Sequence, residues 1–330
     1  MKKQILLILL LLSIFTASFA EEEQSENLPD TSGGFYLETG IGAGLQFGIV
    51  TENFYRLFST TGLYQVSWLN WQMMPACLGT VNVKTGYEFN NNRSINFEAY
   101  FSSTFPTVTG SMEDFDALKF DDRITDFSHH DNYTDLFIDT GLYFDYSFPN
   151  GFGLGINFEY KNVKFRAQNG YAQHTSNGYG TYEYWSPDMP HTSDYTGNTV
   201  ITYDFFSFYW KPGIVWRYGF TDRIHLGIDA WFCLYRFDHA LDIHYVANVP
   251  HDYYTDIVEK WFSGLDVRAT ANYAFTDHFS LSLRVAGEFL PPAYDDDYVG
   301  VPPDTKINKG YKGGFDAWSV SATVFAIMRF

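Results

Sequence analysis

The sequence predicts an all-β protein, a ten-stranded antiparallel transmembrane β-barrel with long extracellular loops. Three observations lead to this fold class. Apolar and polar residues alternate with a period of two in many segments, short turns alternate with long connections, and the last alternating segment ends at Phe330. Short turns at one end, longer loops at the other and an apolar outward face are typical of barrels that cross a membrane.

The segment 135–148 illustrates the alternation. Apolar residues such as Leu142 and Phe144 share one parity, and polar residues such as Asp139 and Asp145 share the other. Successive side chains of a strand point to opposite faces, so each such segment has one apolar and one polar face. A soluble β-sandwich also alternates, but here charges stand in the middle of strands and long connections follow short turns. These two features favour the barrel.

We expect ten strands, with boundaries accurate to a few residues. The expected strands are 34–48, 63–89, 94–110, 134–148, 152–167, 198–219, 224–238, 258–275, 279–290 and 314–330. Five long connections, at 49–62, 111–133, 168–197, 239–257 and 291–313, then face the outside of the cell. A ten-stranded lumen is narrow, so its charged side chains are expected to plug it, which disfavours a diffusion pore.

Composition excludes several functional classes. The chain has 330 residues, a fifth of them aromatic, with 18% charged residues and a net charge of −18. Nucleic acid is not expected as a partner because Lys and Arg carry most phosphate contacts. Two cysteines are too few for a disulfide scaffold, and no metal-ligand spacing is present, so neither a metal nor another cofactor is expected.

The N-terminus has the pattern of an export signal. Lys2 and Lys3 precede an apolar run that ends near Phe15, and Ser18 and Ala20 form a small-x-small cleavage pattern. We therefore expect a signal peptide at 1–20, a polar leader at 21–33 and a single barrel domain at 34–330.

Two aspartates after the third expected strand are the first candidate catalytic residues. Asp114 and Asp116 share the inward parity of that strand, provided that it continues without a bulge. Two close carboxyl groups repel when both are ionised, so one pKa rises, which suits proton transfer around a water. Taken alone, the pattern also fits a solvated acidic loop.

Asp242 and His244, in the fourth long connection, form the second candidate pair. In extended backbone they share a face, and an aspartate that orients a histidine makes it a good general base. Taken alone, the histidine also fits a surface position.

Both motifs occur where they do in the omptins, a family of ten-stranded outer-membrane aspartyl endopeptidases that the sequence resembles. The resemblance extends along nearly the whole mature chain at low overall identity. Its matching stretches are Gly48 with Glu52, Ser67 to Trp71, Ser111 to Asp116, Ser128 to Asp131, Lys164 to Ala167, and Asp242 to Tyr245.

The resemblance implies a mechanism and a location. Asp114 and Asp116 would form one wall of an extracellular groove, and Asp242 with His244 the other, with a water between them activated by His244. The protein would be an outer-membrane enzyme that cleaves peptides or proteins near basic residues, its active site facing outward. Outer-membrane lipid would be a further partner. The alternative is a non-catalytic barrel of the same ancestry that acts as an adhesin or surface-binding protein.

Two substrate-binding positions follow from the same resemblance, and a third departs from it. Glu52 corresponds to one acid of the pocket for a basic side chain, and Met112 to a residue that lines the pocket after the scissile bond. The second acid of the basic pocket corresponds to Ala240, and nearby Asp238 cannot be placed from the sequence. A weaker preference for Arg or Lys is therefore expected.

The two cysteines are expected to remain unbonded. Cys77 shares the parity of Leu69 and Trp71, which we assign to the outer face of the second strand, with a possible bulge at Pro75. Cys233 has the inward parity of the seventh strand. Thiols on opposite faces of distant strands do not meet the geometry that a disulfide requires.

Overall fold

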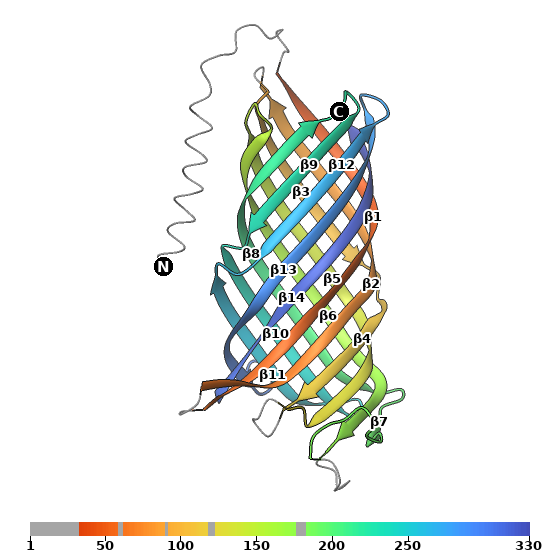
Figure 1. Ribbon diagram of the computed structural model, residues 1–330, viewed down its shortest axis with the longest axis vertical. Coiled ribbons are helices and arrows are strands. Elements are labelled where there is room, and N and C mark those ends of the chain that lie inside the picture. The colour runs from red at the N-terminus through yellow and green to blue at the C-terminus, as the bar shows by residue number, and fades with distance from the viewer. Residues whose placement is uncertain (1–32, 59–61, 90–91, 118–122, 176–182) are drawn as a thin grey trace. The chain divides into compact units, whose positions relative to one another are not determined.

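Antiparallel strands form one closed ring in the computed structural model (Figure 1). The structure describes residues 33–330 except 59–61, 90–91, 118–122 and 176–182. The signal peptide and, apart from Gly33, the polar leader lie outside the described residues. The strands are β1 (Gly34–Phe58), β2 (Gly62–Glu88), β3 (Ser94–Thr104), β4 (Thr107–Asp116), β5 (Asp126–Ser147), β6 (Phe152–His174), β7 (Ser193–Asp194), β8 (Thr199–Gly219), β9 (Ile224–Phe232), β10 (Tyr235–Val246), β11 (Val249–Trp261), β12 (Leu265–Ala274), β13 (Phe279–Val299) and β14 (Lys306–Arg329).

Ten positions make up the ring, as the sequence predicts. Three of them are strands with a short break, namely β3 with β4, β9 with β10, and β11 with β12. The two-residue β7 pairs only with the end of β6. Strand β14 pairs with β1 and closes the ring, with Ile41 opposite Ala326. The all-β antiparallel barrel is therefore confirmed.

The strands extend much further than predicted. Most of the residues expected in the five long connections are strand, so that β10 and β11 are joined by Ala247 and Asn248 alone. Both residues have a positive φ, of 51° and 64°, as the tight two-residue turn of a hairpin requires. In Figure 1 this end of the barrel carries the labels β4, β7 and β11, opposite to the C-terminus.

The barrel has apolar side chains outside and charged ones inside. Outward residues such as Ile41, Val81 and Val324 are exposed, whereas Glu98 and Lys211 are buried in the lumen. Water would disfavour such an apolar outer band, and lipid would cover it. Within the described residues, no helix is long and apolar enough to cross a membrane.

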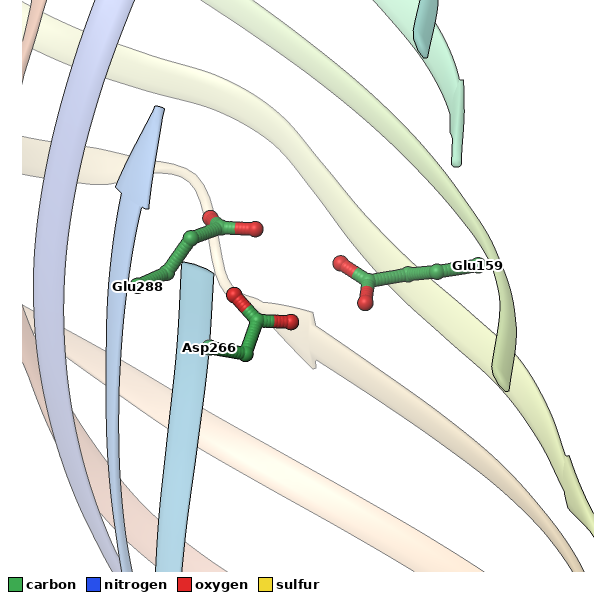
Figure 2. Close-up of side chains that lie close together, drawn as sticks. All are labelled: Glu159, Asp266 and Glu288. Carbon is green, nitrogen blue, oxygen red and sulfur yellow. The ribbon is translucent and has the colours of Figure 1, made fainter. Parts of the chain in front are cut away.

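Ion pairs fill the lumen at the level of the apolar band. Figure 2 shows Glu159, Asp266 and Glu288, whose carboxylate oxygens lie within 4.8 Å of one another. The ammonium of Lys211 lies 2.9, 2.5 and 3.1 Å from these three carboxylates in turn, and Lys161 contacts Glu159 at 2.9 Å and also pairs with Glu288. The two ammonium groups take the place that a cation would occupy, so this cluster is a salt-bridge plug.

A bulge in β2 corrects one prediction about its faces. On β1, Gly48 pairs with Met73 and Gln46 pairs with Ala76, so the two residues Met74 and Pro75 of β2 correspond to the single β1 residue between them. The inward parity changes at this point, so Leu69 and Trp71 face inward and are buried, not outward as expected. Cys77, beyond the bulge, is exposed, Cys233 is buried, and both thiols are free, as predicted.

Candidate active site

Asp114 and Asp116 lie in strand β4, not in a loop. The chain does not continue from β3 without a bulge, because it breaks after the buried Thr104 and shifts register again between Val108 and Gly110. The two irregularities compensate for each other, so even-numbered residues face inward both before and after them, as the buried Thr104 and Met112 show. Both aspartates therefore point inward, as predicted, although the condition attached to that prediction is wrong.

Strand β4, which carries these aspartates, is paired with β2 on one side and β5 on the other. On β2, Leu69 stands opposite Asp114 and Ser67 opposite Asp116. The hydroxyl of Ser67 donates to Asp114 Oδ1 at 3.5 Å. On β5, Asp126 stands opposite Asp116.

Asp242 and His244 lie in β10, again in strand instead of the predicted loop. Asp242 is buried, and its Oδ2 lies 2.7 Å from His244 Nε2. This contact leaves Nδ1 as the ring nitrogen available to a water. The His244 ring also meets the ring of Tyr254 edge to face, with centroids 5.5 Å apart. Asp242 and Tyr254 therefore both contact the His244 ring.

Electrostatic interactions link the two walls. Burial raises the pKa of Asp114 well above its usual value, and the charges of Asp116 and Asp242 raise it further, while His244 lowers it. Burial alone would lower the pKa of His244, but Asp242, by charge and hydrogen bond, and then Asp114 and Asp116 raise it to about 9. The charges of each residue pair therefore change the pKa values of the other pair.

Proton content follows from these shifts. With a pKa of about 9, His244 is an imidazolium at neutral pH, hydrogen-bonded to Asp242. On the other wall burial raises the pKa of Asp114 well above its usual value and that of Asp116 to about 6. Groups with pKa values displaced toward neutrality are suited to proton transfer, and they cluster in catalytic sites.

Glu52 and Met112 occupy different layers of this region. Glu52, on β1, is 6% exposed, and burial followed by the charges of Asp242 and Asp256 raises its pKa well above the usual value. Met112 is fully buried among Trp71, Phe165 and other apolar side chains.

Two further acids, which were not predicted as site residues, complete the acidic region. Asp256 of β11 stands directly opposite Ala240 of β10 and, on its other side, opposite Asp297 of β13. Burial raises the pKa of Asp256 well above its usual value, and it hydrogen-bonds to Asp297. Burial likewise raises the pKa of Asp297 to about 6.

Asp256 is packed tightly against strand β14. A Cβ added at Gly313 would lie 1.8 Å from Asp256 Oδ1, so only glycine leaves room for this carboxyl group. Asp238, considered above as a substitute acid, lies elsewhere. It is buried against Arg236 Nε at 2.5 Å and accepts a hydrogen bond from Ser207 at 2.7 Å.

Several buried polar atoms of this region lack a hydrogen-bond partner among the described residues. Buried polar atoms are usually hydrogen-bonded, so these atoms can accept or donate hydrogen bonds to a molecule that enters the region. The atoms are Glu52 Oε2, Asp242 Oδ1, Asp256 Oδ1, Asp297 Oδ1 and the Tyr203 hydroxyl.

Comparison with known proteins supports the fold. No protein-family model and no curated protein matches the sequence. Among solved structures, the barrel is similar to the outer membrane protease OmpT from Escherichia coli, with a TM-score of 0.71 and 17% identity over 93% of this chain and 99% of that one.

Other outer-membrane barrels are much less similar. Neisserial surface protein A is 10% identical over 89% of this chain and 97% of its own, with a TM-score of 0.26. Ail from Yersinia pestis is 12% identical over 91% and 100%, with a TM-score of 0.27.

Proposed function

We propose that the protein is an outer-membrane endopeptidase of the omptin type. The observation that carries the proposal is the pairing of a hydrogen-bonded Asp242–His244 dyad with the Asp114–Asp116 acid pair, each perturbing the other's protonation. The barrel's similarity to OmpT, a protease, is consistent with it. The exposed apolar band supports a location in the outer membrane with lipid as its partner. We propose in addition that the active site faces the extracellular side.

In the proposed reaction, a water lies between the two walls. His244, once neutral, takes a proton from the water as its oxygen attacks the peptide carbonyl carbon. Asp242 fixes the ring by holding Nε2, and it stabilises the imidazolium that forms. No covalent enzyme intermediate arises, since the nucleophile is water.

The acid pair has a complementary task. Asp114, whose pKa burial raises well above its usual value, can in its protonated form donate a hydrogen bond to the water or to the carbonyl oxygen on which negative charge develops. The amine that leaves takes its proton from the imidazolium of His244, which returns the dyad to its starting state. Asp116 supports the pair from the neighbouring position on the same face.

We further propose that the peptide substrate carries a basic side chain next to the cleaved bond. Buried carboxyl oxygens without partners attract a guanidinium or an ammonium, and Glu52 and Asp256 interact electrostatically across the region. Asp256, directly opposite Ala240, supplies the acid that position 240 lacks. Met112 would support the pocket after the scissile bond.

The test of catalysis is cleavage of a fluorogenic peptide library by the protein refolded in detergent or lipid. His244→Ala should abolish cleavage while the barrel still forms, because His244 lies beyond the apolar band. His251→Ala is the matched control, since His251 is an exposed histidine at the same end, on β11. Cleavage that persists in His244→Ala would refute the mechanism. A folded wild type that cleaves no peptide would favour the adhesin alternative.

The test of specificity compares kcat/KM for peptides with Arg or with an uncharged residue at the cleavage site. Asp256→Asn should lower the Arg value by about tenfold or more, since a charge-assisted hydrogen bond contributes about 1.5–3 kcal/mol. Asp304→Asn is the control, because Asp304 is exposed in the turn between β13 and β14 at the same end of the barrel. An unchanged ratio would remove Asp256 from the pocket.

A further inference from the structure

A second Asp–His pair lies beside the acid wall. One row of inward-facing residues crosses four neighbouring strands, with Ser67 on β2, Asp116 on β4, Asp126 on β5 and His174 on β6. Residues directly opposite each other on antiparallel strands lie about 4.5–5.5 Å apart at Cβ. Asp116 is therefore the immediate neighbour of Asp126, and Asp126 that of His174.

Asp126 is buried and held in its charged form. Its carboxylate accepts hydrogen bonds from the Thr125 hydroxyl at 2.8 Å and the Thr175 backbone N–H at 3.1 Å. His174 Nδ1 lies 3.3 Å from Oδ1. Burial would raise the pKa of Asp126, but the contacts with His174 and Thr125 lower it below its usual value.

A permanently charged Asp126 has a consequence for Asp116. Like charges directly opposite each other in a sheet destabilise the pair, so the negative charge of Asp126 favours a proton on Asp116. His174 opposes this effect when it is protonated. The groups that interact with Asp116 are Asp114 on its own strand, Ser67, Asp126, His174, His244 on β10 and Tyr254 on β11.

We propose that Asp126 and His174 are positioning residues of the hydrolytic site, which act through Asp116 by setting its charge and do not contact the reacting bond. The inference rests on the proposed function for its role in catalysis. The charge coupling between the pair and Asp116 does not depend on catalysis and can be measured by itself.

The direct measurement is the titration of Asp116 in the refolded protein, with ¹³C-labelled aspartate and the resonance assigned through Asp116→Asn. Asp126→Asn should move the Asp116 midpoint to lower pH by about half to one unit, because a like charge is removed. His174→Gln should move it to higher pH, because an opposite charge is removed. His174→Lys keeps a positive charge and should retain the wild-type midpoint or lower it.

If Asp126→Asn does not assemble, His174→Gln and His174→Lys provide the test. The His174 side chain is 30% exposed at the end of β6, so its variants do not disturb the buried wall. A midpoint that does not change in either variant, or that changes in the same direction in His174→Gln and His174→Lys, would overturn the inference whether or not the protein cleaves peptides.

The enzymatic measurement separates positioning from substrate contact. The part of the pH profile of kcat/KM near pH 6, where Asp116 titrates, should move with the Asp116 midpoint in each variant, while KM changes less than about twofold. A large rise in KM without displacement of that part of the profile would place Asp126 in contact with substrate and overturn the positioning role. If the wild type cleaves no peptide, the proposed function fails, and the titration alone decides whether the pair sets the charge of Asp116.

Discussion

Replacement of Asp242 by Asn tests the electrostatics of the dyad most directly. The carboxylate of Asp242 lies 2.7 Å from His244 Nε2 and, against the opposing effect of burial, is the main group that raises the pKa of His244 from 6.5 to about 9. That difference corresponds to roughly 3 kcal/mol between the two protonation states. The His244 side chain is 37% exposed, so solvent screening reduces it, and a fall of about one to two units is expected.

The assay is ¹³C NMR titration of ring-labelled histidine in the refolded barrel, with His244 assigned by its absence in His244→Gln. The effect on stability has a definite sign. A raised histidine pKa stabilises the fold fully below pH 6.5, and this contribution disappears as the pH rises through about 9.

Asp242→Asn should therefore be less stable than the wild type at pH 6, and the deficit should shrink toward pH 10. Asp277→Asn, an exposed change in the turn between β12 and β13, should leave the His244 titration unchanged. A His244 midpoint within about 0.3 units of wild type in Asp242→Asn would refute the reasoning.

Three further predictions concern the lumen, the pocket and the thiols. Lys211→Met leaves three carboxylates without their shared ammonium, so chemical denaturation should show a loss of about 3–5 kcal/mol, and a loss below 1 kcal/mol would contradict the plug. Ala240→Asp places a second buried carboxyl opposite Asp256, and this variant should lower kcat/KM for Arg peptides. The double variant with Asp256→Ala should restore kcat/KM. Equal activity of the single and the double variant would mean that these positions do not share a pocket. Cys77 and Cys233 should both be alkylated after denaturation without reductant, and mass spectrometry would reveal any bridge as a contradiction.

The sequence predicts the part of the barrel that faces lipid much better than the part beyond it. In the apolar band one face is apolar and the other polar, so alternation is strong and strands such as 279–289 are easily found. Beyond the band both faces meet water or polar groups, and the contrast between parities disappears. Residues 111–116 and 239–257 therefore resemble loops in sequence although they are largely strand.

The candidate site shows the same division. Asp114, Asp116, Asp242 and His244 could be predicted because short-range spacing places each pair on one face of extended backbone and because both motifs resemble those of a known family. Asp256 was missed because its position depends on register with Ala240 and Asp297, which no local pattern contains.

The pairing of β1 with β14 has a consequence for how the protein acquires its shape. Asn53 donates a hydrogen bond to Asp316 at 2.8 Å across this seam, from 263 residues away in the chain. Contacts between such distant residues form slowly, because ordering the long intervening chain is entropically costly. Until the seam forms, two long edges with unpaired N–H and C=O groups are open to any other extended chain. Folding must therefore compete with aggregation, and a chaperone or an assembly factor that covers these edges would act at the closing step.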